Sequence, residues 1–81
     1  MPVSLLRIAD VTERIGRRKS TVYLNVRRGL MTPPVKLGAR ISGWPSSEVD
    51  ELIRAEIAGA TPDELRKLVS RLVAERSRVA A

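Results

Sequence analysis

The fold is decided by the stretch Ser20-Thr21-Val22-Tyr23-Leu24-Asn25-Val26-Arg27-Arg28-Gly29-Leu30. Ser20 or Thr21 is suited to cap a helix N-terminus, because a side-chain oxygen there accepts a hydrogen bond from an otherwise unpaired amide. Gly29 offers the left-handed backbone that commonly ends a helix, and Leu30 can then fold back onto the last turn. This stretch therefore predicts a short helix that begins near Ser20 and ends near Gly29.

The two sides of this predicted helix differ in their chemistry. Val22 and Val26 are four residues apart and share a face that suits a small core. Tyr23, Arg27 and Arg28 fall elsewhere on its surface and offer one aromatic hydroxyl and two guanidinium groups. These groups favour a negatively charged partner, because a guanidinium pairs in two-pronged fashion with phosphate or guanine.

An apolar stripe ahead of this helix predicts another, from about Arg7 to Ile15. The stripe consists of Leu6, Ile8, Val11 and Ile15. Gly16 ends that helix, and the basic turn 17–19 leads into the Ser20 helix. Two short helices joined by such a turn form a helix-turn-helix. Residues 1–6 have no clear period and are expected to be a frayed lead-in or a short strand.

The segment after the helix pair predicts a β-hairpin. Pro33 and Pro34 cannot continue a helix and force an extended path. Apolar and polar residues alternate over 35–37 and 41–44, and Gly38-Ala39-Arg40 joins the two runs. A hairpin placed directly after a helix-turn-helix is a wing, whose basic tip is positioned to meet phosphate. So small a hairpin needs a neighbour, and four apolar residues are expected to pack on the helices. These are Val35, Leu37, Ile41 and Trp44.

Two more helices are expected to complete the chain. Ser46 or Ser47 would cap a helix whose apolar stripe reaches Ile57, and residues 58–60 would end it. Thr61-Pro62-Asp63-Glu64 matches a capping box, with Thr at the cap and Glu three residues later. The last helix, over about residues 62–78, has an apolar stripe at positions 65, 68, 69, 72 and 73.

The composition excludes several functional classes. The chain has 81 residues with no Cys and no His, which indicates one small domain without disulfides, zinc sites or His-based catalysis. No apolar run is long enough to span a bilayer, and the N-terminus lacks the order of a signal peptide. The carboxylates sit on helix caps and exposed faces, with no nucleophile–base pair, so we expect no enzymatic activity. We also expect no cofactor, no metal and no small-molecule ligand.

The positive charge is concentrated in the middle of the chain. From Arg14 to Ser47 there are eight basic residues and no acidic residue, whereas the remainder holds seven basic and nine acidic residues. The middle therefore carries a charge of +8 and the flanks −2, within a net charge of +6. A segregated positive field attracts polyanions and speeds their association. The alternative, a solvated face of a generally basic protein, fits the complete lack of acids less well.

Five short segments share a recognisable pattern. They are Leu5-Leu6-Arg7-Ile8-Ala9-Asp10-Val11, Ser20-Thr21-Val22-Tyr23, Arg28-Gly29, Pro34-Val35-Lys36-Leu37-Gly38, and Gly43-Trp44 through Ser47-Glu48-Val49-Asp50. Together they resemble the AlpA family of small phage and prophage DNA-binding regulators, over about residues 5–53. That family is related in fold to MerR-type winged helix-turn-helix proteins and to phage excisionases.

The resemblance implies a mainly α fold with a small β-hairpin. Residues 1–58 would form a winged helix-turn-helix domain of MerR/excisionase type, to which the capping box and apolar stripe described above add an amphipathic C-terminal helix at residues 61–81. The implied partner is double-stranded DNA, at a promoter or attachment site, and the implied location is the cytoplasm, on the nucleoid of a bacterium. Leu24 and Asn25 depart from the family, which commonly has a basic and then an apolar residue there. This departure would change which bases are read or alter the packing beneath the helix. Residues 61–81 lie outside the resemblance.

The expected DNA contacts come from three places. The recognition helix contributes Ser20, Thr21, Tyr23, Arg27 and Arg28, the turn contributes Arg17, Arg18 and Lys19, and the wing contributes Lys36 and Arg40. Hydroxyls usually meet phosphate, whereas Arg reads either phosphate or guanine. Tyr23 has an alternative role as a cover over the core with its hydroxyl at the surface. Trp44 is expected to be a core residue, because its hairpin needs an apolar anchor.

Two interpretations of the last helix stay open. It folds back to complete the core, or it pairs with a second copy through Leu65, Leu68 and Leu72 to give a homodimer or a weak multimer on DNA. The expected function is a sequence-specific DNA-binding transcriptional regulator of phage or prophage type. One alternative is an excisionase-like recombination directionality factor. Another, of a different class, is a small protein-interaction module that uses the C-terminal helix.

Overall fold

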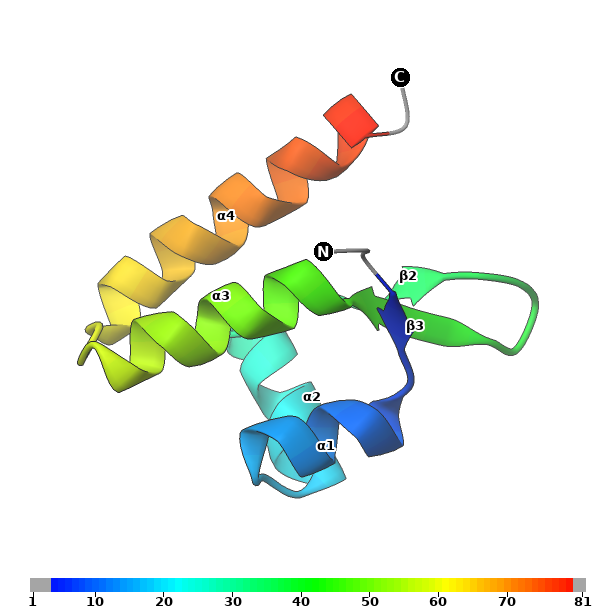
Figure 1. Cartoon of the computed structure of the whole chain (residues 1–81), viewed down its shortest axis with the longest axis horizontal. Helices are drawn as coiled ribbons and strands as arrows, with labels where there is room; N and C mark the ends of the chain where they lie inside the picture. Colours follow the sequence, from blue (N-terminus) through cyan, green and yellow to red (C-terminus); the bar gives the residue numbers. More distant parts are fainter. Residues whose placement is uncertain (1–3, 80–81) are drawn as a thin grey trace.

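The computed structural model describes residues 4–79 as four helices around a small three-stranded sheet (Figure 1). The elements are β1 (Leu5–Leu6), α1 (Ile8–Ile15), α2 (Lys19–Arg28), β2 (Val35–Lys36), β3 (Ser42–Pro45), α3 (Ser46–Ile57) and α4 (Pro62–Val79). The expected fold class, a mainly α winged helix-turn-helix with an added C-terminal helix, is confirmed. In the part of the chain that the structure describes, no helix combines the length and apolar character of a membrane span.

Helix α2 ends as predicted but begins differently. Gly29 has a φ of 76°, and the amide of Leu30 donates to the carbonyl oxygen of Asn25 over 2.9 Å, which closes the last turn. The expected cap at Ser20 or Thr21 is wrong. The N-cap is Arg18, whose side chain makes no capping hydrogen bond, and Ser20 lies inside the first turn. The helix therefore begins one residue before the first hydroxyl.

A short N-terminal strand turns the predicted hairpin into a three-stranded sheet with the order β1-β3-β2. Both pairs are antiparallel: Leu6 lies opposite Trp44, and Val35 lies opposite Gly43. Of the expected lead-in or strand at residues 1–6, the strand is found at Leu5–Leu6, and residues 1–3 lie outside the described part. Because β1 also pairs with β3, the hairpin has a neighbour within its own sheet.

The packing prediction for the hairpin is correct for Trp44 and wrong for Leu37 and Ile41. Trp44 is completely buried, but Leu37 is 43% exposed and Ile41 is 45% exposed. The two exposed residues lie at the far end of the hairpin, beyond the strands that pack against helices (Figure 1). A Cβ added to Gly43 would lie 3.3 Å from Cδ1 of Leu37, so Leu37 covers the glycine on the outer face.

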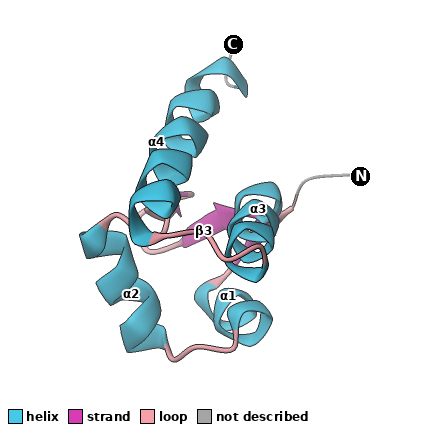
Figure 2. Ribbon diagram, turned by 90° about the vertical axis from the view of Figure 1, so that its left-hand side faces the viewer, coloured by secondary structure: helices cyan, strands magenta, loops and turns pink. Residues whose placement is uncertain are grey.

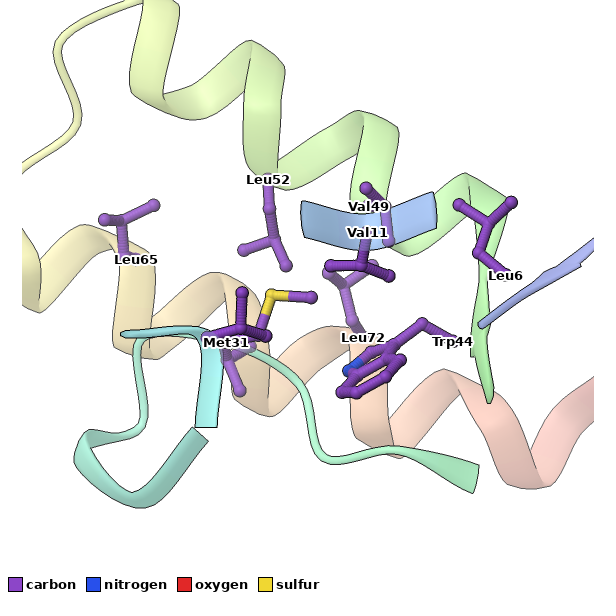
Figure 3. Packing of buried hydrophobic residues seen from close by; sticks show 10 residues of the cluster. Leu6, Val11, Met31, Trp44, Val49, Leu52, Leu65 and Leu72 are labelled. Atoms are coloured by element: carbon purple, nitrogen blue, oxygen red, sulfur yellow. The ribbon is translucent and has the colours of Figure 1, made fainter. Parts of the chain in front are cut away.

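The core joins all the helices to the sheet. Its buried members are Leu6, Val11, Val22, Met31, Trp44, Val49, Leu52, Leu65, Val69 and Leu72. Figure 2 shows α1 and α3 stacked on one side of β3, with α2 and α4 on the other. Leu65 and Leu72 of α4 point into the space also occupied by Leu52, Met31 and Trp44 (Figure 3). The last helix therefore packs on the domain, with Leu65 and Leu72 buried and Leu68 half-buried.

The two C-terminal helices begin in different ways. The capping box of α4 is confirmed, since the Thr61 amide donates to Glu64 Oε1 over 2.9 Å and the Glu64 amide donates to Thr61 Oγ1 over 3.2 Å. The expected serine cap of α3 is wrong, because Pro45 is the N-cap. Ser46 instead pairs with Ser4: its amide donates to the Ser4 carbonyl over 2.7 Å, and its hydroxyl accepts from the Ser4 amide over 2.9 Å. The serine thus joins α3 to the start of the sheet.

Candidate nucleic-acid interface

The N-terminal end of α2 is an open, positively charged helix end. Its first turn contains no acidic residue, and Arg18, Lys19 and Ser20 are all exposed. The amides of residues 19–21 find no acceptor among the described residues, since the first helical bond of α2 runs from the Val22 amide to the Arg18 carbonyl. Free amides, a helix dipole and basic side chains together favour a phosphate group at this position.

The C-terminal end of α2 also presents positive charge. Arg27 and Arg28 occupy its last turn and are exposed, in a position where cations interact favourably with the helix dipole. On the core-facing side, Val22 is buried and Val26 packs against the core, as the i, i+4 spacing predicted. The helix is therefore anchored along one face and basic at both ends.

The wing carries two further exposed cations. Lys36 is the last residue of β2 and lies opposite Ser42, and Arg40 stands in the loop that joins β2 to β3. The Leu37 amide donates to the Ile41 carbonyl over 2.7 Å, which closes the hairpin beneath that loop. In Figure 1 the loop projects away from the helices, so Arg40 stands at the outer end of the wing.

Ion pairs divide the basic residues into two groups. Five arginines pair with carboxylates of α3 or α4: Arg14 with Asp50, Arg17 with Glu56, Arg66 with Asp63, Arg71 with Glu51 and Glu75, and Arg76 with Glu48. Six basic residues of the expected DNA-binding set pair with no carboxylate in the part of the chain that the structure describes. They are Arg18, Lys19, Arg27, Arg28, Lys36 and Arg40. The unneutralised charge of the central segment is thus concentrated on α2 and the wing.

Arg17 differs from the other members of the expected set. Its guanidinium makes a two-pronged contact with the Glu56 carboxylate, with N–O distances of 2.8 and 3.0 Å. Glu56 lies 39 residues away in the sequence, and no local pattern indicates the pair. Both side chains are about one-third exposed, so this is a surface pair of small free energy. Arg17 therefore has a carboxylate partner that a phosphate would have to replace.

Tyr23 and Thr21 are less exposed than the arginines of α2. Both are half-buried, and the Tyr23 ring lies with its centroid 6.0 Å from that of Trp44, at an interplanar angle of 52°. This tilted arrangement is a favourable aromatic contact, so the ring covers the core. The Tyr23 hydroxyl makes no hydrogen bond to another described residue. The ring and the hydroxyl can therefore serve different purposes, the first in packing and the second at the surface.

Asn25 and Leu24, the two departures from the family pattern, are both half-buried. Asn25 borders a small hollow between the ends of α1, α2 and α3, which is also lined by Met31 and Leu52. Asn25 therefore lies near the buried side of α2. Within residues 4–77, no three His, Cys, Asp or Glu side chains are close enough together to hold a metal ion.

Comparisons with known proteins give one family match and one curated relative. Residues 4–57 match the sequence profile of the family described as "Prophage CP4-57 regulatory protein (AlpA)", which covers β1 to α3. The chain is also 37% identical over 54 residues to the uncharacterized protein ORF88 of Enterobacteria phage P4. That alignment covers 67% of this chain and 61% of the phage protein. No solved structure matches the chain.

Proposed function

The chain belongs to the AlpA family of prophage regulatory proteins, and from this premise we propose that it is a sequence-specific DNA-binding transcriptional regulator. In the proposed complex, α2 enters a major groove of the duplex. The β2–β3 wing then contacts the adjacent backbone, as in other winged helix-turn-helix proteins. In this proposal the DNA-binding unit is residues 1–58, and α4 is an addition to it.

The observation that carries the proposal is the position of the unpaired cations. Six basic side chains without a carboxylate partner lie at the two ends of α2 and on the wing, whereas five arginines pair with carboxylates of α3 or α4. Among the other basic side chains that the structure describes, Arg7, Arg54 and Lys67 are exposed without a carboxylate partner elsewhere on the surface. Cations without a carboxylate partner are directly available to phosphate, whereas a paired arginine first has to exchange its carboxylate.

The contacts have distinct roles in the proposed complex. Arg18, Lys19, Ser20 and the free amides at the start of α2 bind phosphate, which fixes the position of the helix. Arg27 and Arg28 point from the last turn and are the candidates for guanine contacts. Lys36 and Arg40 bind backbone beside the wing, and the hydroxyls of Thr21 and Tyr23 are within the same surface.

The first experiment is fluorescence anisotropy with two duplexes, one taken from upstream of the protein's own gene and one scrambled, over a series of salt concentrations. We expect tighter binding to the upstream duplex and a steep loss of affinity with salt. Equal, weak binding to both would reduce the function to a charge effect, and selection from a random duplex pool would then search for another site. No binding to any duplex at low salt would overturn the proposal.

The proposed docking is tested by two double variants of equal charge. Arg27→Ala with Arg28→Ala should weaken binding by about 1–3 kcal/mol for each arginine that reads a base. The control is Arg54→Ala with Lys67→Ala, which removes two exposed cations from α3 and α4 without touching α2 or the wing. Equal affinities of the two double variants would contradict the docking even if the wild type binds DNA.

The excisionase alternative uses the same surface and differs in what the protein does to DNA. Binding to several adjacent sites with bending of the duplex, measured by the mobility of circularly permuted fragments, would favour excision over transcriptional control. The protein-interaction alternative needs an apolar stripe on α4 that is free for a partner. The burial of Leu65 and Leu72 in the core favours DNA binding over that alternative.

A further inference from the structure

We propose that α4, which lies outside the matched residues 4–57, holds the recognition helix in a fixed position relative to the wing. Two arginines of α4 carry this role, Arg66 and Arg76. Both contact backbone carbonyls in or beside the segment 29–34, which joins α2 to β2. The proposal rests on the DNA-binding function proposed above, for which both residues are positioning residues.

Arg66 holds the C-terminal end of α2. Its Nε donates to the carbonyl oxygen of Arg28 over 3.1 Å, and this carbonyl belongs to the last residue of the helix. The aliphatic part of the side chain lies against Gly29, since a Cβ added there would be 3.6 Å from Cγ of Arg66. One guanidinium nitrogen also donates to the Asp63 carboxylate over 3.2 Å, which restricts the conformation of the Arg66 side chain. Figure 2 shows α4 beginning close to this end of α2.

Arg76 holds the other end of the linking segment. Its guanidinium donates to the Pro33 carbonyl over 2.7 Å and to both oxygens of Glu48, over 2.7 and 2.8 Å. Glu48 is only 5% exposed and lies in the first turn of α3. The guanidinium thus joins the segment before β2 to the helix that follows β3. The two prolines in this segment donate no backbone hydrogen bonds, so such outside contacts decide its path.

The linking segment is therefore fixed at its two ends by α4 and in its middle by Trp44, whose indole donates to Thr32. This matters for binding because α2 and the wing must meet one duplex at the same time. Groups held in the binding geometry lose less conformational freedom on association than groups that must be ordered first. We infer that loosening either arginine lowers DNA affinity without removing any DNA contact.

The first test needs no DNA and measures how strongly the Arg66 guanidinium stabilises the C-terminal end of α2. Arg66→Met keeps the aliphatic stem against Gly29 and removes the guanidinium. Lys67→Met is the matched control, because Lys67 is an exposed cation on the same helix. Amide hydrogen exchange at Gly29 and Leu30 should become several-fold faster in Arg66→Met alone, with the urea midpoint of both variants close to wild type. Unchanged exchange at these amides in Arg66→Met would overturn the proposed hold.

A second test uses the duplex to which the wild type binds. Arg66→Met should bind about 5- to 10-fold more weakly than wild type, as expected for the loss of one charged hydrogen bond in a preorganised site. The dependence of log affinity on log salt should keep its slope. Lys67→Met should bind like wild type. Equal affinity of Arg66→Met and wild type would contradict the inference.

The salt slope separates positioning from direct contact. If Arg66 touched a phosphate, its loss would reduce the slope by about 0.9, and that result would overturn the inference. If the wild type bound no duplex, the proposed function would fail. The exchange measurement would still decide whether α4 holds the end of α2, so the two failures are distinguishable.

Discussion

The indole nitrogen Nε1 of Trp44 donates a 2.7 Å hydrogen bond to the carbonyl oxygen of Thr32, and both residues are completely buried. This bond joins β3 to the segment that follows α2. The same tryptophan ring packs beside Tyr23 of α2. Trp44 is therefore the residue through which the helix-turn-helix and the wing share one core.

Replacing this tryptophan should destabilise the domain strongly. Trp44→Phe removes the donor, leaves the Thr32 carbonyl unpaired in the core and creates a cavity, so we expect a loss of about 2–4 kcal/mol in the free energy of unfolding. Urea denaturation followed by far-UV circular dichroism measures this loss. A change below about 1 kcal/mol would mean that the indole bond is not maintained in solution.

The hydroxyl of Thr32 should be dispensable. Its Oγ1 is buried and has no hydrogen-bond partner among the described residues, which costs free energy that a methyl group would not. Thr32→Val keeps the shape and the carbonyl that Trp44 needs, so we expect a gain of about 1 kcal/mol in unfolding free energy. Leu52→Ala, which instead empties a buried position, should show a loss in the same assay. A loss for Thr32→Val would show that the hydroxyl has a partner in solution.

Breaking the Arg76–Glu48 pair should lower the free energy of unfolding strongly, whereas replacing both residues with apolar ones should lower it little. Arg76→Met leaves the carboxylate of Glu48 buried without its partner, since the Glu48 side chain is 6% exposed, and we expect a loss of about 3 kcal/mol. Arg76→Met combined with Glu48→Leu removes both charges and should recover most of that loss. Urea denaturation of the two variants tests this, and equal losses in both would contradict the argument.

Acid should weaken the start of α4. The hydrogen bond from the Thr61 amide lowers the pKa of the Glu64 carboxyl below its usual value, and the bond to the Thr61 side chain acts in the same direction. A lowered pKa in the folded state means that the carboxylate stabilises the fold above its unfolded pKa. That contribution is lost as the pH falls through the folded pKa. The stability difference between wild type and Glu64→Gln, followed by thermal unfolding, should therefore be present at neutral pH and vanish in acid. A difference that persists in acid would have another origin.

Signals that act within a few residues were readable only in part, since the predicted caps at Ser20 or Thr21 and at Ser46 or Ser47 are wrong. Contacts between distant residues were not readable. Gly29 ends α2 and Thr61 caps α4 as predicted, because both depend on their immediate neighbours. Trp44 was predicted in the core from the hairpin's need for an anchor. Leu37 was expected to pack on the helices but is exposed. The hairpin is supported by β1 instead, and no short-range pattern predicts that pairing.

The same limit applies to the candidate site. Which basic residues are neutralised is decided by partners far along the chain, such as Glu56 for Arg17 and Glu48 for Arg76. Residue types alone placed Arg17 and Arg18 in one class, and the structure separates them. Likewise, the bond from Arg66 to the Arg28 carbonyl spans 38 residues. The DNA contacts themselves stay predictions.

Glu56 should restrain DNA binding by occupying Arg17. The pair is exposed enough to exchange, with 38% of the Arg17 side chain and 32% of the Glu56 side chain accessible, so its free energy is about 0–1 kcal/mol. Glu56→Gln removes the competing charge and frees the guanidinium for phosphate, next to the open end of α2. In the proposed complex, we expect about 2- to 5-fold tighter binding at low salt and a steeper salt dependence, as one more phosphate is neutralised.

The matched control is Glu75→Gln, which removes the same charge from α4 while Arg71 keeps its contact with Glu51. Fluorescence anisotropy should show tighter binding for Glu56→Gln than for Glu75→Gln. Equal affinities would mean that Arg17 stays out of the interface and serves only to join the turn to α3.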